Sequence, residues 1–141
     1  MPAKQTRMSY GISAQRFHAS ALRSMPVTVH PELQAFDILK AEGVWVVPQS
    51  APSSSKPHVK IGLMNLMPVK QPTETQILRM MGRSPAHVDV TLFVPDSYAA
   101  KNTPPEYLKK FYKRWSEIKS EKFDGFIVTG APIETLPFEE V

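Results

Sequence analysis

The sequence predicts an α/β protein built on a parallel sheet with helices on its faces. Short, largely apolar runs that are typical of buried strands alternate with segments whose apolar residues recur at helical spacing. The connections between these segments are short, and a strand–helix–strand series forms right-handed crossovers and therefore a parallel sheet. The chain has 141 residues, of which 42% are hydrophobic, and this is enough for one domain with a core.

The first predicted element is a helix at residues 31–42, with a proline in its first turn and Gly43 just past its end. Residues 44–47 are a short apolar run and are predicted to form a strand. Residues 48–57 contain four serines and three prolines and are predicted to be a loop. Residues 59–66 are largely apolar, which is typical of a strand buried on both faces in a parallel sheet.

A second helix is predicted at residues 72–82, with Thr73 as its cap and Gly82 at its end. Residues 87–94 form the next predicted strand. A third helix is predicted from residue 102 to residue 115, because a cap residue and two prolines precede aromatic and aliphatic residues at helical spacing.

Phe126 to Val128 is predicted to be a third buried strand of this series. The last residues, 138–141, resemble the start of a further helix. Because three strands make only half of such a sheet, we expect the sequence to be truncated to the N-terminal half of its fold.

The net charge of +4 comes from residues 1–24, which hold four basic residues and no acid. Residues 25–141 carry 13 residues of each sign, so no nucleic-acid partner is expected. We expect a basic, disordered extension at residues 1–24 and one domain at residues 25–141. The extension either precedes a natural start at Met25, which is the favoured interpretation, or is a targeting peptide.

The chain contains no cysteine, so it holds no disulfide, no thiolate metal site and no cysteine nucleophile. No apolar run approaches the roughly 20 residues that a membrane span requires. We therefore expect a soluble, cytoplasmic protein without a metal and without a membrane partner.

Ligands of a doubly wound sheet gather at the carboxyl ends of its strands, which here are followed by residues 65–68, 95–97 and 129–134. Gly130 and Ala131 follow a predicted strand directly, so backbone N–H groups there could approach a bound oxygen and stabilise an oxyanion. Taken alone, this motif is weak, and a plain tight turn is the favoured interpretation.

Three blocks of the sequence resemble the homoserine O-succinyl/acetyltransferase family. The first block is KIGLMNLMP at residues 60–68, followed by Lys70 and by TETQ at residues 73–76. The other two are KNTP at residues 101–104 with Phe111 and Tyr112, and the segment from FDG at residues 123–125 to Pro132. Three blocks in the right order, within a match from about Met25 to Val141, are more specific than any single motif.

The resemblance implies a class I glutamine-amidotransferase-like fold with a three-layer, flavodoxin-like sheet. It also implies a homodimeric enzyme of methionine biosynthesis with L-homoserine and acyl-CoA as substrates and no further cofactor. In such an enzyme a cysteine accepts the acyl group and passes it to the homoserine hydroxyl, a histidine activates the thiol, and a glutamate orients the histidine. None of these three positions lies in this chain.

The oxyanion side of the site is what the resemblance assigns to this chain. The Ala131 N–H would be the donor, Gly130 would permit the turn, and Pro132, which has no N–H, would shape the loop. Asn65 would contact the substrate. Glu134 would select the acyl donor, since glutamate at this position accompanies acetyl-CoA in the family and glycine accompanies succinyl-CoA.

A fixed carboxylate at Glu134 would repel the carboxylate of a succinyl group and exclude it. The alternative is that Glu134 is only an acid near a helix N-terminus. The favoured function is therefore acetyl transfer from acetyl-CoA to L-homoserine. The alternatives are the same reaction with succinyl-CoA and, from a different class, a non-catalytic amidotransferase-like binding module.

Three further groups have two interpretations each. Residues 73–76 either cap a helix or contact a substrate. Phe111, Tyr112 and Trp115 are interpreted as core packing, with stacking on the adenine of CoA as the alternative. Lys109, Lys110, Lys113 and Arg114 are interpreted as a solvated helix face, with binding of a CoA phosphate as the alternative.

Overall fold

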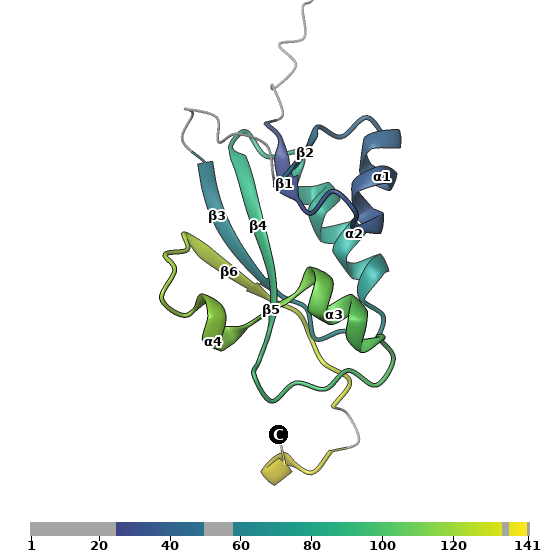
Figure 1. Ribbon diagram of the computed structural model, residues 1–141, viewed down its shortest axis with the longest axis vertical. Coiled ribbons are helices and arrows are strands. Elements are labelled where there is room, and N and C mark those ends of the chain that lie inside the picture. Colours follow the sequence, from purple (N-terminus) through teal and green to yellow (C-terminus); the bar gives the residue numbers. More distant parts are fainter. Residues whose placement is uncertain (1–24, 50–57, 134–135, 141) are drawn as a thin grey trace, which may run out of the picture.

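The computed structural model describes residues 25–49, 58–133 and 136–140 (Figure 1). Within these ranges six parallel strands form one sheet in the order β2-β1-β4-β3-β6, with β5 paired to the end of β4. The strands are β1 (Val27–Val29), β2 (Val46–Pro48), β3 (His58–Met64), β4 (His87–Val94), β5 (Lys113–Arg114) and β6 (Gly125–Val128). The predicted parallel α/β sheet is confirmed.

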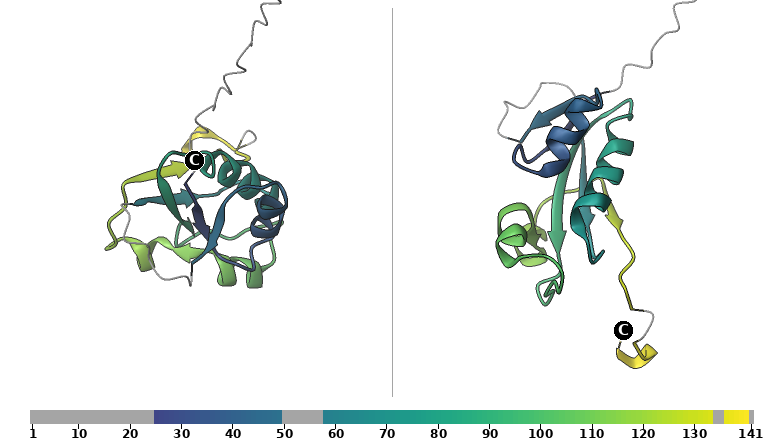
Figure 2. Two further views of the ribbon diagram at one scale, coloured as in Figure 1. Left: turned by 90° about the horizontal axis from the view of Figure 1, so that it is seen from above. Right: turned by 90° about the vertical axis from the view of Figure 1, so that its right-hand side faces the viewer.

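The helices lie on both faces of this sheet. They are α1 (Gln34–Ala41), α2 (Lys70–Met81), α3 (Pro105–Phe111) and α4 (Trp115–Ile118), followed by the 3-10 turn η1 (Phe138–Glu140). The left view of Figure 2 shows α2 on one side of the sheet and α3 and α4 on the other, and α1 packs beside α2. No helix in the described ranges has the length and apolarity needed to cross a membrane.

The core lies around β4. Alternate residues of β4 are buried with residues of β1 and β3 against side chains of α1 and α2, because parallel strands covered by helices bury apolar side chains. The core residues concerned are Val27, Val29, Leu39, Leu63, Leu78, Val88, Val90, Leu92 and Val94. This packing fixes the position of β4 and, through it, of the loops that follow the central strands.

β3 and β4 pair over seven residues, from His58 opposite His87 to Met64 opposite Phe93. Gly62 of β3 lies beneath two aromatic rings. A Cβ atom at this position would lie 2.5 Å from Phe126 and 3.0 Å from Phe93, which is closer than side chains pack. Glycine is therefore required at residue 62 for the rings to rest on the sheet.

Several element boundaries differ from the prediction. β1 was not predicted, and β2 begins two residues later than the predicted strand at residues 44–47 and includes Pro48. Most of the predicted loop, residues 50–57, and the predicted extension at residues 1–24 lie outside the described residues.

The predicted N-terminal caps of the second and third helices were wrong, whereas Gly82 ends α2 as predicted. α2 begins at Lys70 with Val69 before it, and no side chain caps it, so Thr73 lies inside the helix. α3 likewise has Pro104 at its N-cap and no side-chain cap. It ends at Phe111 rather than at residue 115, because the chain turns extended at Tyr112 and then joins the sheet as β5.

The strand at Phe126 to Val128 was predicted to be buried, and this was wrong. The side chains of Phe126, Ile127 and Val128 are 49%, 37% and 60% exposed. In the described residues β6 pairs only with β3 and stands at the edge of the sheet, so its outer side and part of both faces are open.

Candidate functional site

The loops after β3 and β6 are bound to each other at the carboxyl end of the sheet, the lower end in Figure 1. Thr129 makes the connection. Its backbone N–H donates to the carbonyl of Met64 (3.0 Å), and its hydroxyl accepts a hydrogen bond from the N–H of Leu66 (2.8 Å). Two of the three loops that the sequence placed at the site therefore lie side by side.

Gly130, Ala131 and Pro132 follow Thr129 directly. Gly130 does not have a positive φ, and a Cβ atom there would have no neighbour within 4 Å, so the backbone gives no steric reason for a glycine. Within the described residues the Ala131 N–H has no hydrogen-bond partner, while its carbonyl accepts from Ile133 (2.9 Å). The oxyanion role of this loop stays a prediction. Glu134 lies outside the described residues, and its role in donor selection also stays a prediction.

Asn65 is fully buried at the start of the loop after β3. Its side-chain amide donates to the carbonyl of Lys70 (3.3 Å) and to the hydroxyl of Tyr112 (3.1 Å), and its Oδ1 accepts from the N–H of Met67 (3.1 Å). The side chain supports the loop from inside the protein. Direct contact between Asn65 and a substrate stays a prediction, and this geometry does not favour it.

Lys70, the first residue of α2, is also fully buried. Its Nζ donates to the carbonyls of Asn65 (2.6 Å) and Met67 (2.9 Å) and to the hydroxyl of Tyr98 (2.6 Å). All three donors of the ammonium group are thereby used, as burial of this charge requires. Lys70 ties the loop after β3 to the chain that follows β4.

Glu74 lies one turn further along α2 and is fully buried as well. The hydroxyl of Tyr107 (2.6 Å) donates to one carboxylate oxygen and that of Tyr112 donates to the other. Burial raises the pKa of Glu74, and the two hydrogen bonds oppose that rise. Burial and the neighbouring carboxylate raise the pKa of both tyrosines far above the ordinary value, so both remain donors.

These contacts form one buried polar network beneath the candidate site, made of Asn65, Lys70, Glu74, Tyr98, Tyr107 and Tyr112. The sequence interpretation of Glu74 as part of a helix cap was wrong, because α2 begins at Lys70 and Glu74 faces the core. A signal was available in the spacing: Lys70 and Glu74 are four residues apart and continue the stripe of Leu78 and Met81.

The predicted core packing of the aromatic cluster is confirmed for Tyr112, which is buried, and Phe111 packs against the core. Trp115 is 41% exposed and packs against the rings of Phe93 and Phe126, with centroids 6.0 and 6.2 Å away. Stacking of these rings on adenine stays a prediction.

The predicted basic helix face was only partly correct. Lys109 and Lys110 lie on α3, but Lys113 and Arg114 form β5. Arg114 is half-buried, and its Nη1 donates to the carbonyls of Pro95 (3.1 Å) and Tyr98 (2.7 Å). It therefore holds the chain after β4 in place. In the described ranges, no three His, Cys, Asp or Glu side chains are grouped so that they could hold a metal ion.

Comparison with known proteins places the chain in a family. The sequence profile of a family described as "Homoserine O-succinyltransferase" matches residues 26–141. The chain is 49% identical over 118 residues to a protein of Desulfitobacterium hafniense (strain DSM 10664 / DCB-2) named "Homoserine O-acetyltransferase". Proteins with the same name from Shouchella clausii and Sinorhizobium fredii (strain NBRC 101917 / NGR234) are 45% and 49% identical to it, each over 119 residues.

These matches cover 83% to 84% of the chain but only 38% of each of the three relatives. The chain therefore spans about two fifths of the length of the curated relatives that it matches. The family profile, at residues 26–141, covers both central strands and the loops at their carboxyl ends.

Proposed function

The chain belongs to the homoserine O-succinyltransferase family, and from this premise we propose that it forms the oxyanion side of the active site of a homoserine O-acetyltransferase. The reaction would transfer an acetyl group from acetyl-CoA to the hydroxyl of L-homoserine, with CoA as the leaving thiol. Because the chain contains no cysteine, the nucleophile, its histidine and the orienting glutamate of this reaction would come from the remaining length that the relatives have.

One structural observation carries this proposal. The loop that holds the Ala131 N–H is bound through Thr129 to the loop after β3, and within the described residues that N–H has no partner. A fixed N–H donor at the carboxyl end of a parallel sheet suits the stabilisation of a developing oxyanion, because it needs no rearrangement when charge appears. Pro132 restricts the backbone conformation of the loop, and because it has no N–H it cannot itself donate to the oxyanion.

Acetyl-CoA is the proposed donor because the three relatives above carry the acetyltransferase name and because the chain has glutamate at residue 134. Succinyl-CoA is the second candidate, since the family itself is described by succinyl transfer. A glutamate carboxylate near the acyl group would repel the carboxylate of a succinyl donor, and this favours acetyl-CoA.

The experiment is a direct assay of the full-length protein that contains this chain. L-homoserine is offered with acetyl-CoA or with succinyl-CoA, and both CoA release and the acylated product are measured. We expect O-acetylhomoserine as the main product. O-succinylhomoserine as the main product would overturn the choice of donor, and no acyl transfer with either donor would overturn the proposed function. We also propose a homodimer in the cytoplasm, which light scattering and localisation of a tagged protein would test.

A further inference from the structure

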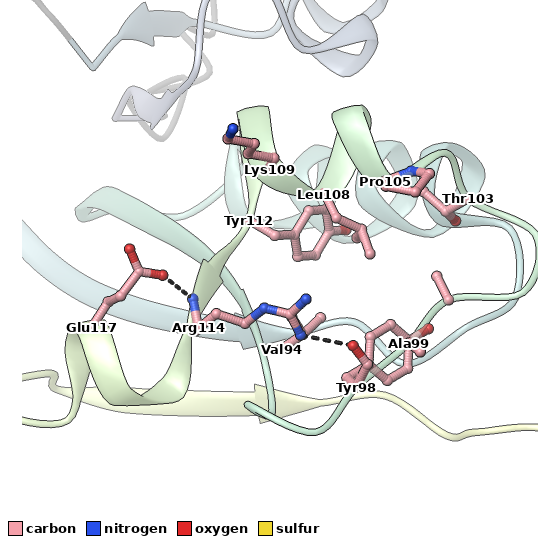
Figure 3. Close-up of a pocket in the computed structure, with 11 residues that line it drawn as sticks. Val94, Tyr98, Ala99, Thr103, Pro105, Leu108, Lys109, Tyr112, Arg114 and Glu117 are labelled. Carbon is pink, nitrogen blue, oxygen red and sulfur yellow. Dashed lines mark hydrogen bonds between the residues drawn. The ribbon is translucent and has the colours of Figure 1, made fainter.

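A cavity of about 500 Å³ lies beside the end of β4, between α3 and the chain that joins β4 to α3 (Figure 3). This volume lies within the range of small-molecule sites. One part of its wall is apolar and is formed by Val94, Ala99, Ala100, Pro105 and Leu108. The remaining lining residues are polar or aromatic, and the cationic ones among them suggest which ligand the cavity would accept.

Arg114 supplies the main positive charge. Its Nη1 donates to the carbonyls of Pro95 (3.1 Å), Asp96 (3.4 Å) and Tyr98 (2.7 Å). Within the described residues, Nε and Nη2 make no hydrogen bond and no carboxylate lies within 4.0 Å of the guanidinium. Figure 3 shows this side chain reaching along the cavity between Val94 and Tyr112. Three of its five N–H donors are thus held in place and left for a ligand.

Thr103 supplies a hydroxyl at the end of the cavity away from Glu117 (Figure 3). The residue is only 6% exposed, and its hydroxyl has no hydrogen-bond partner in the described part of the chain. Yet the described residues include no fully buried side-chain polar atom without a partner. The Thr103 hydroxyl is therefore within reach of solvent, and the residue lines the cavity.

Lys109, on α3, also lines the cavity, and Figure 3 shows its side chain directed away from the Arg114 guanidinium, so its charge lies at the rim. Its ammonium group has no acidic partner within 4.0 Å among the described residues, whereas the neighbouring Lys110 pairs with Glu32 at 2.9 Å. Glu117 is the acid among the lining residues, and its carboxylate already accepts the backbone N–H of Arg114 (2.5 Å). The lining therefore carries one more positive than negative charge.

We propose that this cavity binds a small carboxylate with a short aliphatic chain. The free edge of the Arg114 guanidinium would bind the two carboxylate oxygens, since this geometry matches a carboxylate. Lys109 would add positive charge at the rim, Thr103 would offer a further donor, and the apolar wall would cover the aliphatic chain. One guanidinium and a largely apolar wall suit a singly charged carboxylate better than a phosphate. The proposal concerns binding alone and does not depend on the acyl-transfer reaction.

Butyrate is the probe that tests this inference. The full chain, labelled with ¹⁵N, is titrated with sodium butyrate at constant ionic strength while the amide signals of Ala99, Ala100 and Thr103 are followed. We expect saturable shifts with a Kd on the order of 1–10 mM, as befits a ligand of so few atoms. Butyramide, the uncharged isostere, and inorganic phosphate should each bind at least about 5-fold more weakly.

Variants separate the cavity from nonspecific binding. Arg114→Gln should weaken butyrate binding by about 10-fold, because both charge-assisted hydrogen bonds from the guanidinium are lost. Because Arg114 also holds the chain after β4, Lys109→Gln provides a test that spares the fold, with a loss of roughly 2- to 3-fold. Lys110→Gln, on the same helix but outside the lining, is the matched control and should leave the Kd unchanged.

The inference would be overturned by any of three results. The first is the absence of saturable shifts up to about 50 mM butyrate, well above the expected Kd. The second is butyramide or phosphate binding as tightly as butyrate. The third is an equal loss of affinity in the Lys109→Gln and Lys110→Gln proteins, which would mean that only the overall charge matters.

Discussion

The hydroxyl of Tyr112 donates a hydrogen bond to the carboxylate of Glu74, so the residue directly after α3 is joined to α2 in the interior of the protein. Tyr107 donates to the other oxygen of the same carboxylate. Since α2 and α3 lie on opposite faces of the sheet, this carboxylate connects the two layers just beneath the candidate site.

Replacing Glu74 by glutamine should destabilise the protein. Glutamine keeps the shape but has one acceptor oxygen, so one tyrosine hydroxyl would face an amide N–H₂ and lose its acceptor. We expect the free energy of unfolding to fall by about 1–3 kcal/mol, measured by urea denaturation. Glu106→Gln, at an exposed acid of α3, is the control and should change it little. Equal effects of the two substitutions would contradict the role given to Glu74.

The stability of the parent protein should depend on pH through Glu74. Burial raises the folded-state pKa of this group above its ordinary value of 4.5, so the folded state binds more protons than the unfolded state between the two values. The associated stability is fully present below the ordinary pKa and is lost as pH rises through the raised one. The difference in unfolding free energy between the parent and Glu74→Gln should therefore shrink as pH rises. A difference that stays constant or grows across that window would show that Glu74 does not titrate this way.

Lys70→Met should cost more stability than any exposed lysine substitution. Methionine fills the space but leaves the carbonyls of Asn65 and Met67 and the hydroxyl of Tyr98 without their donor. We expect a loss of about 3 kcal/mol in chemical denaturation. Lys101→Met, at an exposed position, provides the comparison. If both variants unfold at the parent's denaturant concentration, the buried polar network does not stabilise the fold.

Replacement by alanine should affect the stability of the protein differently at Gly62 and at Gly130. Gly62→Ala places a Cβ against Phe126 and Phe93 and should destabilise the protein by about 1–3 kcal/mol. Gly130→Ala meets no atom within 4 Å and requires no unusual φ, so its effect should stay within about 0.5 kcal/mol. Thermal denaturation of both variants measures the contrast, and a larger loss for Gly130→Ala would reverse our account of both positions.

Glu134→Gly in the full-length protein should raise activity with succinyl-CoA relative to acetyl-CoA, by about 10- to 100-fold if the carboxylate excludes the longer donor. Glu134→Gln keeps the volume and removes the charge. If charge repulsion dominates, the donor preference of Glu134→Gln should shift partway toward succinyl-CoA. If side-chain volume dominates, its donor preference should equal that of the parent. The kcat/KM ratio of the two donors is the measurement, and an unchanged ratio in both variants would remove Glu134 from donor selection.

The central part of the fold was predictable because its elements carry strong local patterns. The strand at residues 87–94 was predicted with the bounds that the structure shows, and the strand beginning at residue 59 and the helix ending near Gly82 were close. β1 has three residues and β5 has two, too few for any period to show, and both form because a longer neighbour, β4, offers free backbone groups.

The meeting of the loops after β3 and β6 was predictable, but the side chains that support these loops were not. The strand order brings the loops after β3 and β6 together, as expected for parallel strands. Lys70 and Glu74, which support these loops, lie inside the protein. Sequence patterns do not predict this, because charged residues are usually exposed. Their partners Tyr98, Tyr107 and Tyr112 are at least 24 residues away in sequence, so only the folded chain brings them together.

β4 lies between β1 and β3, although it is synthesised after both of them. In the described sheet β1 pairs with β2 and β4, and β3 pairs with β4 and β6. Without residues 87–94, no backbone hydrogen bond of the sheet would join the β1–β2 pair to β3. A nascent chain must therefore keep a β1–β2 pair and a solitary β3 apart until His87–Val94 leaves the ribosome and inserts between them. Pairings over such sequence separations form slowly. A ribosome that stalls before His87 would leave a polypeptide with two unattached sheet pieces, which chaperones and proteases would have to handle.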